Sequence, residues 1–327
     1  MMKHLISSIY RKLVIAKRYY RLHIKRYPHL QKCYITCAGK NDGAGAQTLA
    51  ILSTQLFAYD TGIKYVHTPF QKIEHNNENN PDWEKDWEEF FGLGEGELKI
   101  SKLDLSDINY LKISDISQIP LNASGNLYIV SQCHDYANLF PNRYKSLKGK
   151  LLEKYQSFSK QQYQSDMYDY NQLSIVLHIR RGDIISKGKL SERYTSNDEI
   201  NCLLQNIISI ISQNQLKLSI SIYSQGKLED FKEILDKHQN YNTKIYLDEC
   251  VFKTFNALVN ADILLMSKST FSYTAALLSS GIKIYEPFYH PPLDDWLICD
   301  RKYSFNRVKF QKSLQYFLSQ KKSFVPF

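Results

Sequence analysis

The stretch that decides the fold is Leu173-Ser174-Ile175-Val176-Leu177-His178-Ile179-Arg180-Arg181-Gly182-Asp183. In it, a mostly apolar run ends directly in two guanidinium groups, a glycine and an acid. The apolar residues show no strict alternation, which is typical of a parallel strand covered on both faces. We therefore predict a buried strand over 173–179 whose carboxyl end carries polar side chains.

Strands and helices alternate outward from this stretch. Further strands are predicted over 216–223, 244–247, 263–266 and 282–285, with helices near 198–212, 228–238, 251–260 and 270–279. The less regular first half has predicted strands over 33–37, 64–67 and 127–131 and helices over 48–59 and 144–158. This order predicts an α/β protein with two Rossmann-like domains. We place an N-terminal α/β domain over 29–165 and a C-terminal doubly wound domain over 166–327, which suits a chain of 327 residues.

The net charge of +9 belongs to one end of the chain. Residues 1–41 hold ten Lys or Arg and no Asp or Glu, so residues 42–327 have 32 basic and 33 acidic side chains, a net charge of −1. Apolar residues at helical spacing predict a basic amphipathic helix over 1–28. Residues 3–26 of this helix would bind an anionic membrane surface or pack on the body of the protein. The near-neutral body argues against nucleic-acid binding.

The cysteines indicate a reducing compartment. All six are scattered and none forms a C-x-x-C pair, so we expect free thiols and a cytoplasmic protein. No apolar run approaches the roughly 20 residues of a membrane span. The alternative location is the inner face of the membrane, to which residues 3–26 would attach the protein as a peripheral protein.

Two arginines at a strand end form the first candidate site. Ligands of open α/β sheets bind at the carboxyl ends of the strands, and Arg180 and Arg181 there would favour an anion such as a phosphate. Gly182 would allow a turn or a close approach to that ligand. An ordinary strand end with surface arginines and Asp183 as a helix cap accounts for the same residues.

Two further segments point more weakly to phosphate. The segment 262–272 runs from a strand into hydroxyls at the start of a helix, where free amides and hydroxyls bind phosphate; ordinary capping by Ser269 or Thr270 is the alternative. Gly43-Ala44-Gly45-Ala46-Gln47 follows the first strand. This loop lacks the third glycine of a dinucleotide fingerprint and the lysine of a P-loop, so a tight turn accounts for it by itself.

Together, the three segments resemble motifs of the fucosyltransferase superfamily, which includes α1,2-, α1,6- and protein O-fucosyltransferases. His178-Ile179-Arg180-Arg181-Gly182-Asp183 is similar to the His-x-Arg-x-Gly-Asp motif. Ser269-Thr270-Phe271-Ser272, preceded by Asp262, resembles the later Asp…Ser-Thr/Ser-Phe-Ser motif, and the glycine loop resembles a Gly-x-Gly-x-Gln loop. The pattern is like that of glycosyltransferase family 11.

The resemblance implies a GT-B-like pair of domains, with the nucleotide sugar on the C-terminal domain and the acceptor on the N-terminal one. It implies inverting transfer of L-fucose from GDP-β-L-fucose to a glycan hydroxyl, without a metal or other cofactor. The acceptor would be a surface polysaccharide or a lipid-linked oligosaccharide, and the linkage α1,2. The motifs imply a donor-binding set of His178, Gly182, Asp262, Ser269, Thr270, Phe271, Ser272, Gly43, Gly45 and Gln47.

Catalysis needs charge stabilisation and a proton acceptor. Arg180 and Arg181 would stabilise the charge that develops on the departing diphosphate. Asp183 is the first candidate for the base that activates the acceptor hydroxyl, and a structural role beside the arginines is its alternative. Glu192 and His67 are weaker acceptor-side candidates, and His67 could equally be a core histidine.

Two observations keep other functions open. The stretch Tyr223-Ser224-Gln225-Gly226 has no acid where the family often has Ser/Thr-Asp-Asp near the nucleotide. A transferase of the same fold that uses another nucleotide sugar is therefore one alternative. The basic N-terminus makes a non-enzymatic binder of membranes or nucleic acid the other.

Overall fold

The fold is known from a computed structural model. It describes residues 28–76, 79–104, 106–120, 124–131, 134–159, 172–182, 184, 192–214 and 216–323. The basic helix predicted over 1–28, with its membrane-facing residues 3–26, lies outside the described residues apart from residue 28, and so does Asp183. Within the described part, no helix is both long and apolar enough to cross a membrane.

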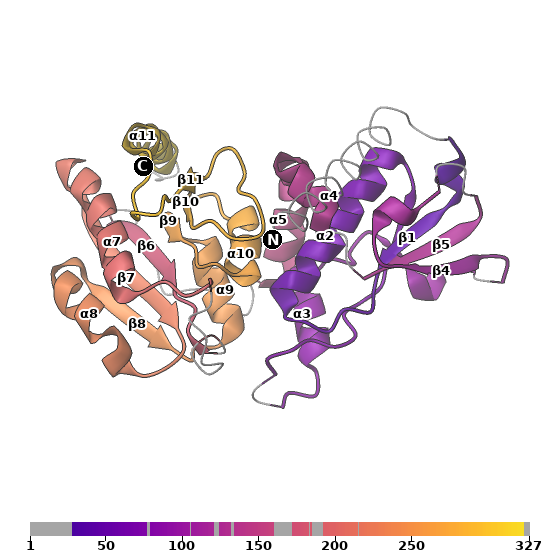
Figure 1. The fold of residues 1–327 in the computed structure, drawn as a ribbon, viewed down its shortest axis with the longest axis horizontal. Coiled ribbons are helices and arrows are strands. Elements are labelled where there is room, and N and C mark those ends of the chain that lie inside the picture. Colours follow the sequence, from indigo (N-terminus) through magenta and orange to yellow (C-terminus); the bar gives the residue numbers. More distant parts are fainter. Residues whose placement is uncertain are drawn as a thin grey trace, which may run out of the picture. The chain divides into compact units, whose positions relative to one another are not determined.

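The chain divides into two compact units, one ending at Phe158 and the other beginning at Ser159. This division lies a few residues before the predicted boundary between 165 and 166. Each unit contains its own sheet of parallel strands covered by helices (Figure 1). The two parallel sheets confirm the predicted α/β class with two Rossmann-like, GT-B-like domains.

The N-terminal unit is built on a five-stranded parallel sheet with the order β3-β2-β1-β5-β4. Its central helix is buried on nearly all sides, and it ends at Gly62 in the left-handed region (φ 79°) that favours glycine. Its strands are β1 (Tyr34–Cys37), β2 (Lys64–His67), β3 (Leu98–Lys99), β4 (Asn109–Ile113) and β5 (Asn126–Val130). Its helices are α2 (Ala44–Thr61), which is the central one, α3 (Trp83–Phe91), α4 (His134–Leu139) and α5 (Tyr144–Ser159).

The C-terminal unit is built on a six-stranded parallel sheet with the order β11-β10-β9-β6-β7-β8. Its strands are β6 (Gln172–His178), β7 (Lys217–Ser224), β8 (Thr243–Leu247), β9 (Ile263–Leu265), β10 (Ile282–Tyr285) and β11 (Leu297–Ile298). Its helices are α7 (Asn197–Ile211), α8 (Lys232–His238), α9 (Val251–Val259), α10 (Thr270–Leu278) and α11 (Arg307–Ser323).

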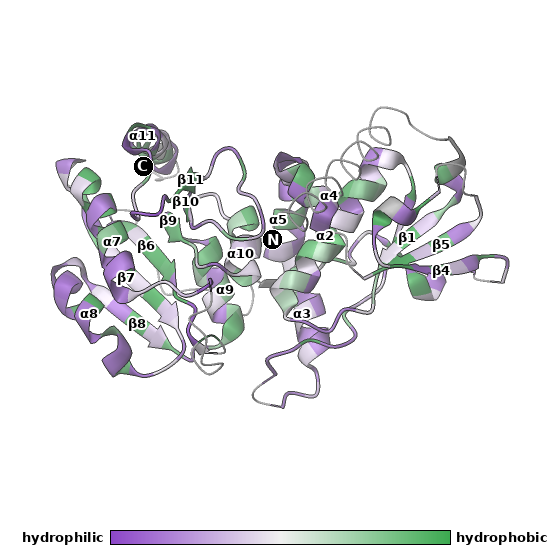
Figure 2. Ribbon diagram, viewed as in Figure 1, coloured by the Kyte–Doolittle hydropathy of each residue, from purple (hydrophilic) through white to green (hydrophobic). Residues whose placement is uncertain are grey.

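Strand β6 lies at the centre of the C-terminal sheet because both of its faces are apolar. Ile175 and Leu177 point to the α7 face and Val176 to the other, and all three are buried. Figure 2 shows hydrophobic residues along the inner strands and more hydrophilic ones on helices such as α8. Pairing of β6 with both β7 and β9 confirms the predicted buried strand.

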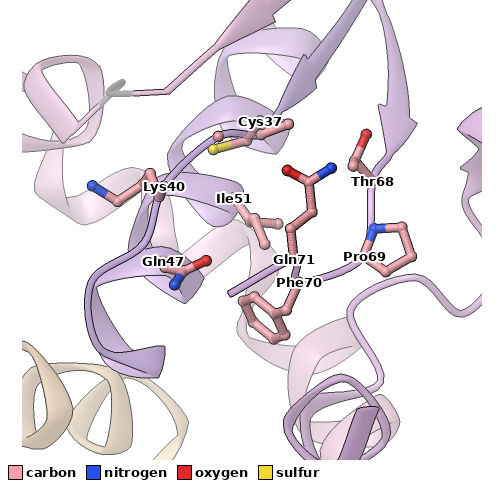
Figure 3. Close-up of a pocket in the computed structure, with 10 residues that line it drawn as sticks. Cys37, Lys40, Gln47, Ile51, Thr68, Pro69, Phe70 and Gln71 are labelled. Carbon is pink, nitrogen blue, oxygen red and sulfur yellow. The ribbon is translucent and has the colours of Figure 1, made fainter. Parts of the chain in front are cut away.

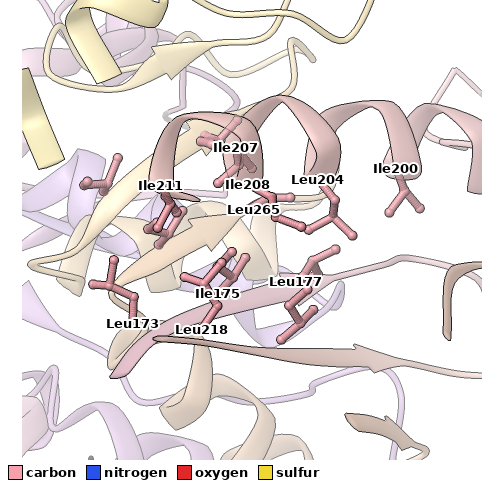
Figure 4. Packing of buried hydrophobic residues seen from close by; sticks show 14 of the residues in the cluster. Leu173, Ile175, Leu177, Ile200, Leu204, Ile207, Ile208, Ile211, Leu218 and Leu265 are labelled. Atoms are coloured by element: carbon pink, nitrogen blue, oxygen red, sulfur yellow. The ribbon is translucent and has the colours of Figure 1, made fainter. Parts of the chain in front are cut away.

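Helix α7 covers one face of this sheet from a firmly fixed start. The Ser196 hydroxyl accepts a hydrogen bond from the Glu199 N–H at 3.2 Å, and the Glu199 carboxylate accepts one from the Ser196 N–H at 2.7 Å. This capping box satisfies two N–H groups at the start of the helix. The aliphatic side chains of α7, among them Leu204 and Ile207, then face those of β6, β7 and β9 (Figure 4).

Most predicted elements agree with the structure to within one or two residues. Helix α2 begins four residues before the predicted 48–59, and α8 begins four residues after the predicted start at 228. The elements β11, α11, α4 and the short β3 and β4 were not predicted. Strand β4 is almost wholly exposed, and β11 has two residues, so neither carries the apolar pattern on which the prediction relied.

Truncation of the core should cost much more than truncation of a surface leucine. Leu204 is fully buried between α7 and the sheet. Leu204→Ala is expected to lower the free energy of unfolding by about 2–5 kcal/mol, because it removes buried methyl groups and leaves a cavity. Leu228→Ala, at a side chain that is 52% exposed, is the matched control and should cost less than about 1 kcal/mol. Denaturant titration checks both, and equal losses would contradict the packing described.

Candidate active site

A pocket opens where strands β6, β9 and β10 of the C-terminal sheet end. It encloses about 390 Å³ of space free of protein atoms, open solvent included. Parallel strands put their carboxyl ends at the same edge, where open α/β sheets bind ligands. Its polar lining is His178, Arg180 and Arg181 after β6, Ser267 after β9, Glu286 after β10, and Arg193 and Thr195 from the segment before α7.

His178 ends β6 and is held by two hydroxyls. Its Nδ1 lies 2.5 Å from the Ser272 Oγ and 2.9 Å from the Ser267 Oγ, and the two hydroxyl oxygens are 3.0 Å apart. The Phe271 ring packs against the imidazole at 5.3 Å. Burial, and then the positive charge of Arg180, lower the pKa of His178 to about 3, so the imidazole is neutral at pH 7.

The start of helix α10 stands beside His178. The Ser269 hydroxyl caps the helix by accepting from the Phe271 N–H at 3.2 Å, and Ser272 is fully buried against His178. Thr270 is half-buried. The hydroxyls of Ser269 and Ser272 therefore form hydrogen bonds within the protein. Thr270, the third residue of the set predicted from the motif, is half-buried.

The two arginines of the motif differ in their surroundings. Arg181 is 3% exposed: its guanidinium lies over the Tyr194 ring at 4.5 Å and donates to the Asn197 Oδ1 at 3.0 Å. Burial lowers its pKa. Arg180 is half-buried in the pocket wall. We infer that Arg180 is placed to contact a ligand, whereas Arg181 is held within the protein.

Gly182 has a backbone conformation that favours glycine. Its φ is +22°, and a Cβ at this position would lie 2.0 Å from the Gln225 Oε1. Gln225 follows β7, in the stretch where the sequence shows no acid. The Ser224 hydroxyl next to it donates to the Ile179 carbonyl at 2.7 Å. This stretch therefore packs on the end of β6.

Glu286 is a pocket residue that the sequence analysis missed. Its carboxylate pairs with the Lys268 Nζ at 2.7 Å and accepts hydrogen bonds from Thr195 at 2.6 Å and Tyr303 at 3.2 Å. Burial, and then nearby Glu286, raise the pKa of Tyr303. The available signal was position, since Glu286 directly follows the predicted strand 282–285.

Asp262 is not brought to this edge. It precedes β9 at the opposite end of the sheet, about 13 Å from Met266 at roughly 3.3 Å per residue. Its carboxylate pairs with the Lys321 Nζ of α11 at 2.9 Å and accepts from the Ser174 N–H at 2.9 Å. Asp262 thus connects the start of β9 to helix α11. This position gives no support to its predicted donor-binding role.

The glycine loop belongs to the N-terminal unit, at the start of α2. Gly43 is the N-cap, and Gly45 lies in the first turn. Gln47 is buried and donates to the carbonyl oxygens of Asp42 at 2.6 Å and Lys72 at 2.7 Å. Gln47 thereby ties two loops together at the carboxyl edge of the N-terminal sheet.

A second pocket lies at this edge of the N-terminal unit. Figure 3 shows Cys37, Ile51, Thr68, Phe70 and Gln71 around it, with the amino group of Lys40 directed away from the others. Gln47 also lines it. This pocket at the carboxyl edge of the N-terminal sheet is therefore lined by both polar and apolar side chains.

The acceptor-side candidates lie in different surroundings. His67 is fully buried, with its Nε2 2.6 Å from the Glu88 Oε1 and its Nδ1 3.0 Å from the Tyr65 hydroxyl, as expected of a core histidine. Glu192 is exposed and is not a lining residue of the pocket in its unit. Asp183 lies outside the described residues.

The part of the chain that contains this strand-end site matches a known family model. Residues 132–292 match the model of glycosyl transferase family 11. This part of the chain is similar to that family. The match confirms the predicted resemblance to the fucosyltransferase superfamily and shows that the chain is a glycosyltransferase. It includes the whole of β6 and α10, and with them the arginines and serines of the pocket.

Several solved structures are similar to this glycosyltransferase at low identity. POFUT1 in complex with GDP has a TM-score of 0.44 and 12% identity, over 77% of this chain and 96% of that one. E. coli heptosyltransferase WaaC with ADP has a TM-score of 0.39 and 12% identity, over 90% and 100%. NodZ alpha-1,6-fucosyltransferase soaked with GDP-fucose has a TM-score of 0.33 and 11% identity, over 76% and 92%. No curated protein matches the chain significantly.

In the part of the chain that the structure describes, no group of three or more His, Cys, Asp or Glu side chains is placed to hold a metal ion. The five described cysteines are free thiols, and Cys133 lies outside the described residues. Sugar transfer without a metal ion stays a prediction.

Asp262 should matter for stability and not for donor binding. Asp262→Asn weakens a buried ion pair with Lys321, and breaking such pairs costs about 3–5 kcal/mol. We expect a lower free energy of unfolding in denaturant titration with an unchanged KM for the donor in the folded enzyme. Asp236→Asn, at an exposed position of α8, is the control. A raised donor KM at full stability would restore the donor-binding role.

His178 should make the protein less stable in acid. Its pKa is about 3 when folded, against the usual 6.5. Below pH 6.5 the unfolded chain binds a proton that the folded one does not, so stability falls as the pH drops from 6.5 towards 3. His178→Gln should reduce this slope by up to about 1.4 kcal/mol per pH unit. Unfolding titrations between pH 7 and 4 measure it, and an unchanged slope would contradict the neutral, buried imidazole.

Proposed function

We propose that this glycosyltransferase transfers L-fucose from GDP-β-L-fucose to a hydroxyl of a glycan, with inversion and in α1,2 linkage. The observation that carries the proposal is Arg180 in the pocket wall at the carboxyl end of β6, beside the start of α10. The family match supports sugar transfer. The motif resemblance supports fucose and the guanine nucleotide.

The pocket chemistry suits a departing diphosphate. In the transfer, the bond between the anomeric carbon and the diphosphate oxygen breaks while the acceptor oxygen attacks from the opposite face. Negative charge then grows on the diphosphate, and fixed donors there lower the barrier. Arg180 supplies a guanidinium, and the N–H groups at the start of α10 supply donors of the helix dipole. In this proposal, no metal ion takes part.

The acceptor hydroxyl must lose a proton as it attacks. We propose Asp183 as the group that accepts it, because it follows the arginines at the end of β6 in the sequence. The acceptor is a surface polysaccharide or a lipid-linked oligosaccharide. We further propose that the protein is cytoplasmic and contacts the membrane through residues 3–26. Deletion of those residues tests the membrane contact.

Another nucleotide sugar is the second candidate. The motivating observation is the segment after β7, where Ser224 bonds the Ile179 carbonyl and Gln225 occupies the space over Gly182. No carboxylate of that segment is there to meet a ribose or a base. The base must be recognised by other groups, so the choice of nucleotide is open to experiment.

A donor panel with one variant tests the proposal. The wild-type enzyme should transfer sugar from GDP-fucose and not from GDP-mannose, UDP-galactose or ADP-heptose. Arg180→Ala should lower kcat/KM for GDP-fucose by about 10²–10³-fold, as expected for loss of a group that stabilises developing charge. Arg301→Ala, at an exposed turn of the same unit, is the control. Preference for another nucleotide sugar would favour the second candidate. Full activity of Arg180→Ala would contradict the proposed donor site.

A further inference from the structure

We propose that Arg193 binds the donor diphosphate as a second guanidinium beside Arg180, and that Glu286 and Thr195 position it. Arg193 lines the same pocket but belongs to none of the motifs in the sequence. The inference rests on the proposed function, because the anion it names is the diphosphate of a nucleotide sugar.

The segment 193–195 is fixed to the ends of three neighbouring strands. After β10, the Glu286 carboxylate accepts from the Thr195 hydroxyl at 2.6 Å. After β9, the Lys268 Nζ donates to the Tyr194 carbonyl at 3.5 Å. After β6, the Arg181 guanidinium lies over the Tyr194 ring. Anchorage by three strands makes this segment a preorganised wall of the pocket.

These anchors also determine which positive charges can meet a ligand. Lys268 is paired with Glu286 at 2.7 Å, and the two charges cancel. Arg181 is buried and held by Tyr194, Phe231 and Asn197. Arg180 and Arg193 both line the pocket and are half-buried, so part of each side chain is accessible there.

Arg193 is oriented by an aromatic ring. Its guanidinium lies over the Tyr289 ring at 5.1 Å, and Tyr289 is exposed. An aromatic ring engages the face of a guanidinium, whereas phosphate oxygens bind along its edge. Tyr289 can therefore hold Arg193 in place while a diphosphate binds. Two guanidinium groups can each form a bidentate contact with a different phosphate of the diphosphate.

Nucleotide binding tests the role of Arg193 apart from catalysis. We expect Arg193→Gln to weaken GDP binding, measured by calorimetry at fixed salt, by about 10- to 100-fold, the range for lost hydrogen bonds to a charged group. Binding of GMP should weaken less. Arg301→Gln removes the same charge from an exposed turn of the same unit and should bind GDP like the wild type.

The outcomes separate this inference from the proposed donor. If Arg193→Gln binds GDP as tightly as the wild type does, the inference is overturned and the donor is unaffected. If the wild type binds UDP instead of GDP and Arg193→Gln weakens UDP binding, the donor proposal fails and the inference holds. A wild type that binds no nucleoside diphosphate overturns both.

The positioning role has its own test. Thr195→Val removes the hydroxyl that Glu286 accepts from and keeps a similar shape. It should raise the donor KM by about 5- to 10-fold while kcat changes little, and Thr195→Ser should restore the wild-type KM. Unchanged kinetics in Thr195→Val, or a serine variant as impaired as the valine one, would show that the hydroxyl does not position the segment.

Discussion

Parallel pairing of β6 with β7 and β9 is the constraint on which the candidate site depends. It brings the ends of neighbouring strands to one edge, where residues far apart in sequence become neighbours. His178 thereby meets Ser267 and Ser272, although about ninety residues of chain separate them. The apolar faces of β6 maintain this pairing, since both faces are packed against helices and the strand has no solvent-facing side. The chemistry of the edge is thus a consequence of burial elsewhere.

The charges at this edge are arranged at a considerable desolvation cost. A buried guanidinium loses its hydration, and Arg181 recovers part of that loss from neutral groups, namely two aromatic rings and an amide. Burial lowers the pKa of Arg181, and Tyr194 and then Asp230 oppose part of that shift. Lys268 and Glu286 neutralise one another. A strand edge built in this way is positive before any ligand arrives, which favours an anion of fixed charge such as a diphosphate.

The sequence allowed the core of the C-terminal unit to be predicted because its strands are continuous apolar runs and its helices have clear starts. Strands β4 and β11 were not predicted from the sequence, because their residues do not show the apolar pattern of a buried strand. For the site, the motif located His178, Arg180 and the α10 start correctly at one edge. It could not separate the two arginines, because burial of Arg181 depends on Tyr194 and Phe231, which only folding brings near.

The donor-binding role that the resemblance implied for Asp262 did not take account of its position relative to the strand. Asp262 precedes the strand predicted over 263–266, and an acid that begins a strand lies at the opposite edge of a parallel sheet from one that follows it. Glu286 shows the converse, as an acid that follows β10 and therefore reaches the pocket. Among the described residues that line the pocket, His178 is neutral and Glu286 is paired with Lys268, so the positive charge there comes from arginine side chains. Arginine does not titrate in the physiological range, so the pocket keeps the same attraction for a diphosphate across that range.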